Sequence, residues 1–300
     1  MRASLRSSMA GFTLTELAVV MAIVALLLGG AIYTLSSQVE QRNFEDTRRR
    51  LEQARELVLA FALVNGRLPC PARSAATATP VTVAGDEVVT TATGCIGDSV
   101  TDYYGGSSGG VALGLLPARS IGYQQVDSDG FAVDAWGNRI RYAVAKNVYT
   151  ETSPNKVCRR NLTSNPPNGD PPLTPHFTHK DNMKMNGLDC KPSDLLICKS
   201  TGVTPAVSAT SCGGTPAGAN QIMTQNLVVA IIFSTGKNGA TGGIGSDEAA
   251  NLNGGGDVDP IFVYHTPTPS TFANGEFDDQ FTWITVGELY GKLIAAGQLP

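Results

Sequence analysis

Residues 11–35 read GFTLTELAVVMAIVALLLGGAIYTL, and this stretch decides what kind of protein the chain is. From position 12 to position 35 the stretch carries a single charged side chain, Glu16. An α-helix rises about 1.5 Å per residue, so about 24 such residues can cross the roughly 30 Å hydrocarbon core of a bilayer. The sequence therefore predicts a transmembrane helix over residues 12–35.

Residues 1–11 form a short leader that carries Arg2 and Arg6 and no acidic residue. Basic residues stay on the cytoplasmic side of a membrane span, so everything after the span is expected to face outward. A secretory signal peptide is the alternative, and it needs a cleavage site of small residues after the apolar run. The residues around Gly30 offer a poor site of that kind, and a strongly helical sequence follows them.

Residues 36–65 continue the helix with an amphipathic pattern. Phe44, Leu51 and Val58 recur every seven residues, and charged residues occupy the opposite face. No proline occurs from position 12 to position 68, while Asn65 and Gly66 supply a stop signal. One helix over residues 12–65 is expected, with an apolar half and a half that packs on a globular domain.

Glu16 is the unusual residue of the apolar half. A carboxylate at the centre of a bilayer costs about 2–3 kcal/mol or more, and such residues usually have a function. The alternative is that Glu16 lies near the membrane interface and stays hydrated. The position of the residue leaves both interpretations open.

The sequence around Glu16 resembles the cleavage and methylation motif of type IV prepilins and type II secretion pseudopilins. The resemblance rests on GFTLTEL at residues 11–17, together with the basic leader and the apolar run, and it covers roughly residues 1–65. It implies that a prepilin peptidase cuts after Gly11 and methylates the new amino terminus at Phe12. It also implies that Glu16 pairs with the new amine of an adjacent subunit, which would neutralise the buried carboxylate. Thr15 departs from the family pattern, in which an aliphatic residue is common.

Residues 66–300 are expected to form an extracytoplasmic α+β domain. Short apolar runs at 131–133, 140–144, 227–233, 261–264 and 281–285 indicate strands, and 287–296 indicate a terminal helix. A hairpin is expected between residues 81–83 and 88–91. The fold class is thus a long N-terminal helix packed on an antiparallel β-sheet domain, with a disulfide-stapled, loop-rich insertion at about 150–225.

Two further segments resemble major pseudopilins: DAWGN at residues 134–138 and STGKNG at residues 234–239. In those pseudopilins the loop after the second segment binds calcium. The resemblance implies that Asp247, Glu248, Asp257 and Asp259 supply oxygen ligands here. Asp278 and Asp279 are either part of the same site or cap a strand. A solvated loop without a metal ion is the alternative for the whole set.

The six cysteines all follow the membrane segment, which favours disulfides in an oxidising compartment. Reduced or metal-bound cysteines are the alternative. We expect Cys70 to pair with Cys95, whereas the sequence does not choose among the remaining pairings. The remaining cysteines are Cys158, Cys190, Cys198 and Cys212.

The sequence favours a structural role and gives little support for an enzyme. It contains neither a Gly-x-Ser-x-Gly elbow nor a phosphate-binding loop, and the net charge of −4 gives no basic face for nucleic acid. His176 and His179 are expected to be exposed loop residues, and His265 a structural one. Calcium is the only cofactor that the sequence suggests.

The resemblance implies a pilin or pseudopilin subunit. The size of the domain favours a minor subunit, because an insertion-rich domain this large would crowd a uniformly packed filament. It would sit in the bacterial inner membrane as a single-pass protein with a periplasmic domain, and then join a pilus or pseudopilus. Expected partners are prepilin peptidase, the inner-membrane assembly platform, the lipid bilayer and other subunits. The domain would be free to bind a surface, DNA or a secreted protein. The alternative is a membrane-anchored periplasmic binding protein or enzyme.

Overall fold

The computed structural model describes residues 13–72, 83–91, 94–95, 114–145, 176–189, 191–192, 195–208, 211–239, 245–252 and 261–299. Within these ranges it leaves out the side chains of residues 28–36, 89–91, 94–95, 182, 185–186 and 189. The chain divides into two compact units, Met1–Glu45 and Asp46–Pro300. The expected division at residue 66 follows the end of the long helix, whereas the compact second unit also contains the last 20 or so residues of that helix.

The long helix α1 spans Leu14–Asn65. It ends where the sequence predicts, because Gly66 takes a positive φ of 68° and donates its N–H to Ala62 O at 2.8 Å. The side chain of Asn65 donates to Phe61 O at 2.9 Å and satisfies another carbonyl of the last turn.

The described residues contain no helix with both the length and the apolarity that a membrane crossing needs. The predicted span over residues 12–35 is therefore not confirmed. Phe12 and the side chains of residues 28–36, which belong to this predicted span, lie outside the described part.

The central sheet of the second unit has the strand order β3-β6-β8 and is antiparallel. Its strands are β3 (Arg141–Val144), β6 (Val228–Ser234) and β8 (Gln280–Thr285). All seven residues of β6 are buried, as expected for a central strand with a continuous apolar run. This confirms the predicted antiparallel sheet.

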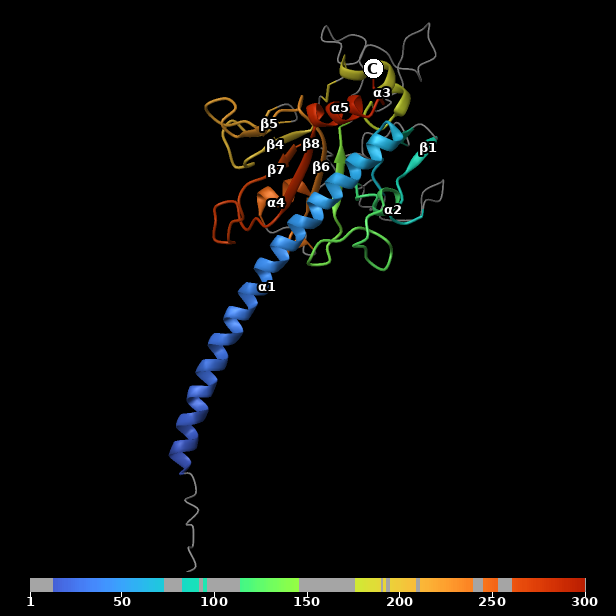
Figure 1. Ribbon diagram of the computed structural model, residues 1–300. Coiled ribbons are helices and arrows are strands. Elements are labelled where there is room, and N and C mark those ends of the chain that lie inside the picture. Colours follow the sequence, from blue (N-terminus) through green and yellow to red (C-terminus); the bar gives the residue numbers. More distant parts are fainter. Residues whose placement is uncertain are drawn as a thin grey trace, which may run out of the picture. The chain divides into compact units, whose positions relative to one another are not determined.

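Residues 46–65 of α1 pack against this sheet (Figure 1). Leu51 and Val58 of the predicted stripe, and Ala62 beside them, are at most 2% exposed and share one core with Ile231 and Ile284 of the sheet. Arg55 adds a polar contact, because its Nε donates to Trp283 O of β8 at 3.1 Å.

A second, smaller sheet has the order β5-β4-β7. It consists of β4 (Leu196–Cys198), β5 (Gln221–Met223) and β7 (Ile261–Val263), and β4 runs antiparallel to β5 but parallel to β7. Helix α4 (Ser246–Asn251) covers the free edge of β7. There the Asn251 amide donates to Val263 O at 2.9 Å and accepts from Val263 N at 2.7 Å, in the manner of a neighbouring strand.

The remaining elements are short. They are β1 (Val89–Thr91), β2 (Gly94–Cys95), α2 (Ala118–Ile121), α3 (Lys180–Asn186), η2 (Gly187–Asp189) and the terminal helix α5 (Val286–Ala295). Strand β1 pairs antiparallel with β2. Residues 81–82 of the hairpin predicted between 81–83 and 88–91 lie outside the described part, so that pairing stays a prediction.

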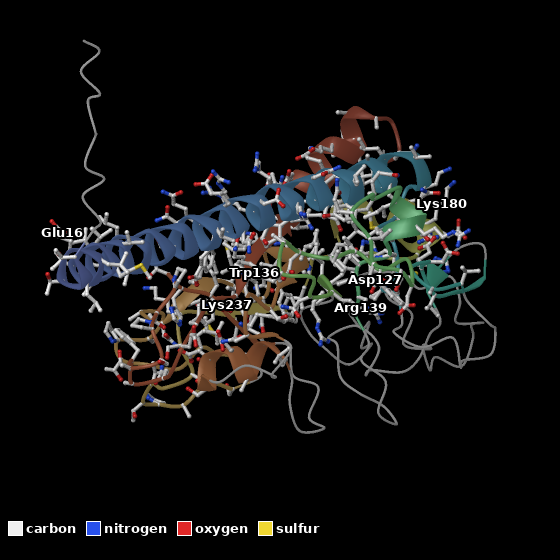
Figure 2. All side chains as sticks on the ribbon, turned by 90° about the horizontal axis from the view of Figure 1, so that it is seen from below. Glu16, Asp127, Trp136, Arg139, Lys180 and Lys237 are labelled. Atoms are coloured by element: carbon white, nitrogen blue, oxygen red, sulfur yellow. A yellow bond between two sulfur atoms is a disulfide. The ribbon has the colours of Figure 1, made fainter. Side chains whose placement is uncertain are left out.

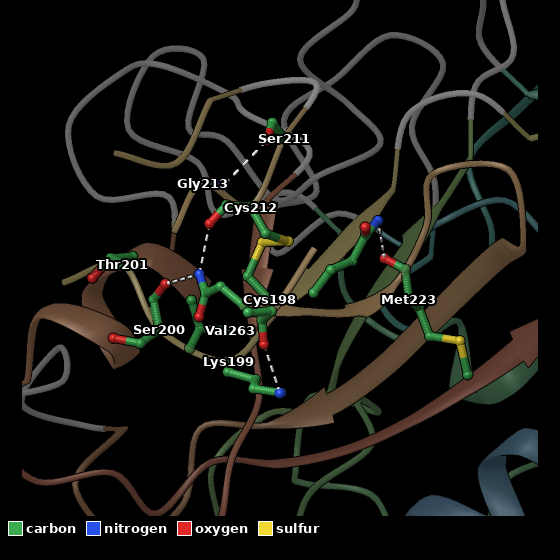
Figure 3. The surroundings of a disulfide bond; sticks show 12 residues. Cys198, Lys199, Ser200, Thr201, Ser211, Cys212, Gly213, Met223 and Val263 are labelled. Atoms are coloured by element: carbon green, nitrogen blue, oxygen red, sulfur yellow. Dashed lines mark hydrogen bonds between the residues drawn. A yellow bond between two sulfur atoms is a disulfide. The ribbon is translucent and has the colours of Figure 1, made fainter. Parts of the chain in front are cut away.

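The described cysteines are oxidised. Cys198 and Cys212 form a disulfide that ties β4 to the loop after it (Figure 3). Beside it the buried Asn220 amide donates to Cys212 O at 2.6 Å and to Ser200 O at 2.7 Å. Cys70 is also disulfide-bonded. The side chain of Cys95 and residues Cys158 and Cys190 lie outside the described part, as does much of the predicted insertion at 150–225.

The contact between α1 and the sheet predicts a strong difference between two alanines of the same helix. Ala54 is 0% exposed within the core, whereas Ala60 is exposed. Ala54→Leu should lower the free energy of unfolding by about 1–3 kcal/mol, because a closely packed core has no room for the added carbons. Ala60→Leu is the control and should change it little. Denaturation of the full chain in detergent, followed by Trp136 and Trp283 fluorescence, measures both; equal effects would contradict this packing.

Candidate functional site

The first turn of α1 holds Glu16, the residue that the sequence singles out (Figure 2). Its Oε2 accepts hydrogen bonds from Thr13 N at 2.9 Å and from Thr13 Oγ1 at 2.8 Å. The apolar residues that follow are exposed in the isolated chain: Leu14 is 86% exposed and Leu26 78%. Gly11 and Phe12, the predicted processing residues, lie outside the described part.

The two pseudopilin-like segments meet in the second unit. Ser234 Oγ donates to Asp134 Oδ2 at 2.6 Å, and Asn138 Nδ2 donates to Gly236 O at 2.6 Å. Figure 2 shows Trp136 and Lys237, from segments about 100 residues apart, on the same side of α1. The sequence identified both segments but did not predict that they bind each other.

Asp134 is the centre of this contact. Its Oδ1 accepts from Trp136 N at 2.9 Å and from Asn138 N at 2.8 Å, which closes the turn. The side chain is 1% exposed. Burial raises the pKa of Asp134, and the hydrogen bonds from Ser234 and Asn138 oppose that rise.

The same turn also binds α1. Arg50 Nη1 donates to Asp134 O at 2.7 Å and to Val133 O at 3.1 Å, and Ala135 N donates to Thr47 Oγ1 at 3.1 Å. Asp46 holds the Arg50 guanidinium in place through a 2.8 Å ion pair. The turn therefore connects α1 to the end of β6, and we name residues 134–138 with Ser234 the turn clamp.

A group of three buried carboxylates lies beyond the turn clamp. Glu248 of α4, and Asp278 and Asp279 just before β8, each offer an oxygen within 4.8 Å of the others. They are 1%, 5% and 2% exposed. Glu248 Oε1 accepts from Asp278 N at 2.8 Å, and Asp279 Oδ2 accepts from Asn251 Nδ2 at 2.7 Å. We call these residues the acidic cluster.

The acidic cluster has the chemistry of a calcium site. Asp278 Oδ1 and Asp279 Oδ1 are buried without a hydrogen-bond partner, which is unfavourable unless a cation or a proton satisfies them. Gly236 lies against the cluster so closely that a Cβ there would be 1.8 Å from Asp278 Oδ1. Carboxylate oxygens are the ligands that calcium prefers. Among the described residues, this is the group of His, Cys, Asp and Glu side chains close enough to hold a metal ion.

The protonation of the cluster follows from its burial. Burial, together with the charge of Glu248, raises the pKa of Asp278 to about 7. Burial also raises the pKa of Asp279 well above its usual value, while Asn251 and Arg141 act in the opposite direction. Without a cation, the cluster therefore retains protons that ordinary carboxyl groups lose near pH 4.

The structure changes the predicted calcium set. Glu248 belongs to the acidic cluster, and Asp278 and Asp279 join it, but Asp247 points elsewhere. Asp257 and Asp259 lie outside the described residues. Adjacent residues of a helix point in different directions, so Asp247 and Glu248 cannot serve one compact site.

Asp247 is instead a structural anchor for loops of the small sheet. Its Oδ1 accepts from Thr201 N and Thr201 Oγ1, both at 2.7 Å, and its Oδ2 from Asn274 Nδ2 at 3.0 Å. Although burial raises the pKa of Asp247, these hydrogen bonds outweigh it and hold the pKa below its usual value. His265 Nε2 lies 3.4 Å from Asp247 Oδ2, and the His265 ring stacks on Phe277. The structural role predicted for His265 stays a prediction.

His176 and His179 are buried, at 2% and 7% exposed, so the prediction of exposed loop histidines is wrong. His176 Nε2 lies 3.1 Å from Tyr290 Oη of α5, and its ring contacts Phe177. Burial and the neighbouring His179 lower the pKa of His176 to about 3. The apolar environment created by α5 was not visible in the Pro-rich local sequence.

Residues 6–32 match the family model of the prokaryotic N-terminal methylation motif. The chain therefore carries this motif, and the resemblance that its N-terminal sequence shows to prepilins and pseudopilins is confirmed. Comparisons of the chain with curated proteins and with solved structures give no match.

The turn clamp predicts that Asp134 is far more important for stability than a nearby surface aspartate. Asp134→Ala should lower the free energy of unfolding by about 2–4 kcal/mol, because the buried Ser234 hydroxyl and the partly buried N–H groups of Trp136 and Asn138 lose their acceptor. Asp129, whose side chain is 61% exposed in its ion pair with Arg139, is the matched control. Asp129→Ala should cost about 0–1 kcal/mol. Denaturation midpoints test this, and similar losses for the two variants would contradict a clamp at Asp134.

The acidic cluster predicts that millimolar calcium raises the melting temperature of the full chain. Glu248→Gln should abolish the increase, whereas Asp247→Asn should keep it, because Asp247 faces another set of groups. Calcium displaces the protons of the cluster, so the increase should be larger at pH 8 than at pH 5, given the raised pKa of Asp278. Scanning calorimetry checks both. An unchanged melting temperature in the wild type at pH 8 would mean that the acidic cluster does not bind calcium.

Proposed function

We propose that the chain is a structural subunit of a pilus-type filament. The single observation that carries this proposal is the match of residues 6–32 to the prokaryotic N-terminal methylation motif. The geometry of α1 supports it, because the segment that carries the motif leads into a helix whose apolar side chains are exposed in the isolated chain. An exposed apolar helix of this kind needs lipid or other helices around it.

The first part of α1 suits a subunit that is inserted in the inner membrane before it is packed into a filament. Leu14, Leu17, Leu26 and Leu27 are 60% exposed or more, so this part has no partner among the described residues of its own chain. We propose that it lies in the inner membrane as part of a single-pass span over residues 12–35, and then packs among the helices of other subunits. Residues 46–65 belong to the globular unit, which carries the proposed periplasmic domain.

Cleavage of the leader comes between membrane insertion and filament assembly. We propose that prepilin peptidase cuts after Gly11 and methylates Phe12, and that Glu16 pairs with the amine of a neighbouring subunit. The assembly platform of the inner membrane would then extract the processed chain. Other pilin or pseudopilin subunits are the partners on which the filament depends.

We further propose a minor, non-enzymatic role. In the described domain, Asp134 holds the turn clamp, Asp247 anchors loops of the small sheet, and the other buried carboxylates form the acidic cluster. Folding or a structural cation explains each of these roles. A subunit placed at a filament tip would leave the domain free to bind a surface, DNA or a secreted protein. A subunit of a type II secretion pseudopilus would have the same N-terminal chemistry.

This function predicts a defined mature amino terminus. Intact-mass analysis and N-terminal sequencing of the membrane-extracted chain should give a protein that begins at N-methylated Phe12. In a host without prepilin peptidase, the same chain should retain residues 1–11. An intact Met1 terminus in both hosts, or a cut near Ala31, would contradict the proposal and favour an anchored or secreted protein.

A further inference from the structure

Two loops of the domain contain no charged residue. Residues 200–220 connect β4 to β5, and residues 266–275 lie between β7 and β8. Neither segment contains Asp, Glu, Lys or Arg, although these types make up 16% of the chain. Charged side chains normally lie at the surface of a protein, and many of the described residues of both loops are exposed. The two loops are therefore an unusual part of the surface.

The two loops lie side by side, and one carboxylate joins them. Asp247 Oδ1 accepts from Thr201 N at 2.7 Å, and Asp247 Oδ2 accepts from Asn274 Nδ2 at 3.0 Å. Asn274 Nδ2 also donates to Ser200 Oγ at 2.6 Å, and a Cβ on Gly202 would lie 2.7 Å from Asn274 Oδ1. Figure 1 shows both loops on the side of the small sheet that faces away from residues 46–65 of α1. We name the described residues of the two loops the uncharged surface.

Phe272 is an exposed aromatic residue of this surface, at 61%. Two successive turns fix its backbone, because Phe272 N donates to Pro269 O and Gly275 N donates to Phe272 O, both at 3.0 Å. Thr268 and Phe277 close the base of this loop with two backbone hydrogen bonds, also of 3.0 Å each. An aromatic ring on a fixed backbone loses little entropy when it meets a partner.

The neighbouring loop is also held in place. The disulfide between Cys198 and Cys212 ties it to β4 (Figure 3). Inside the loop, the Asn220 amide donates to Ser200 O at 2.7 Å and to Cys212 O at 2.6 Å. Since both loops are bonded in this way, the uncharged surface needs little reordering to bind a partner.

The composition of the uncharged surface argues against several kinds of partner. Nucleic acids and anionic membranes are bound through Lys and Arg, and calcium through carboxylates. Protein interfaces are enriched in Tyr, Trp, Met and Arg. Residues 200–220 and 266–275 contain none of these residue types. Lys199, which precedes the first loop, donates its Nζ to Ala219 O at 2.7 Å.

We infer that the uncharged surface binds a neutral polysaccharide and that Phe272 stacks on a sugar ring. The C–H groups on the face of a sugar carry partial positive charge, which the negative face of an aromatic ring attracts. The hydroxyl groups of the sugar suit the Thr and Ser hydroxyls and the backbone groups of the two loops. A neutral polymer also brings no charge that this surface would leave unpaired. The inference rests on the proposed function for its biological role, since a filament subunit would present this surface to the outside.

The experiment measures binding of the purified full chain to cellulose, chitin and amylose, in a detergent without a sugar headgroup. The chain should sediment with at least one of these polymers. The bound fraction should be the same at about 0.1 M and about 1 M salt, although the Debye length falls from about 10 Å to about 3 Å. Double-stranded DNA and anionic lipid vesicles are the comparison probes, and neither should compete with the polysaccharide.

Substitutions of Phe272 separate stacking from a general apolar contact. Phe272→Ala and Phe272→Leu should each lower the affinity about tenfold, the upper end of what an aromatic contact contributes. Phe272→Trp keeps a ring and should bind like the wild type. Leu188→Ala is the matched control, because Leu188 is 58% exposed in η2, outside the uncharged surface, and it should bind normally. All four variants should keep the melting temperature of the wild type, since both side chains are exposed.

Failure to sediment with all three polysaccharides would overturn the inference, as would binding that is lost at the higher salt concentration. Wild-type affinity of Phe272→Leu would also overturn it and would indicate an apolar contact with a protein or a second copy. These outcomes leave the proposed function intact, because that function is tested by processing at Phe12. A chain that binds a polysaccharide but is never processed would contradict the proposed function alone.

Discussion

The packing of residues 46–65 of α1 against the sheet β3-β6-β8 is the contact on which the rest of the domain depends. Leu51 and Val58 bury their side chains in the core that Ile231 and Ile284 provide. Polar groups on the same stretch of helix then fix its neighbours: Arg50 binds the turn clamp, and Arg55 binds both Trp283 O and Glu288 of α5. Because burial of apolar area is the dominant favourable term in folding, these polar contacts mainly set the position of the helix.

The turn clamp and the acidic cluster share one loop, residues 234–239. On one side Ser234 and Gly236 bind Asp134 and Asn138. On the other side Lys237 N donates to Asp278 Oδ2 at 3.0 Å, and Asn238 Nδ2 donates to Glu248 Oε2 at 2.9 Å. A cation at the acidic cluster would therefore order the same loop that holds the turn clamp. Because the turn clamp binds Arg50 and Thr47, the cation would also stabilise the contact between the domain and α1.

Much of the fold follows from the sequence, because the signals that decide it are local. The helix ending at Asn65, the buried strand β6 and the terminal helix α5 each have a strong period or stop signal. The site was only half predictable. Asp247 and Glu248 are adjacent in sequence, but Asp247 binds Thr201 and Glu248 binds Asp278. Asp278 is 30 residues away from Glu248 and lies just before β8, so only the tertiary structure brings the two together. The burial of His176 depends on α5, more than 100 residues away, so the local sequence did not reveal it.

Residues 46–65 of α1 belong to the core of the domain, whereas the apolar residues of its first part are exposed in the isolated chain. The most direct test compares the urea unfolding of two shortened chains, residues 36–300 and residues 66–300, with that of the full chain in detergent. We expect 36–300 to unfold cooperatively at the midpoint of the full chain, and 66–300, which lacks Leu51 and Val58, to show no cooperative transition. If 66–300 unfolds cooperatively at that same midpoint, the second half of α1 is not part of the domain core.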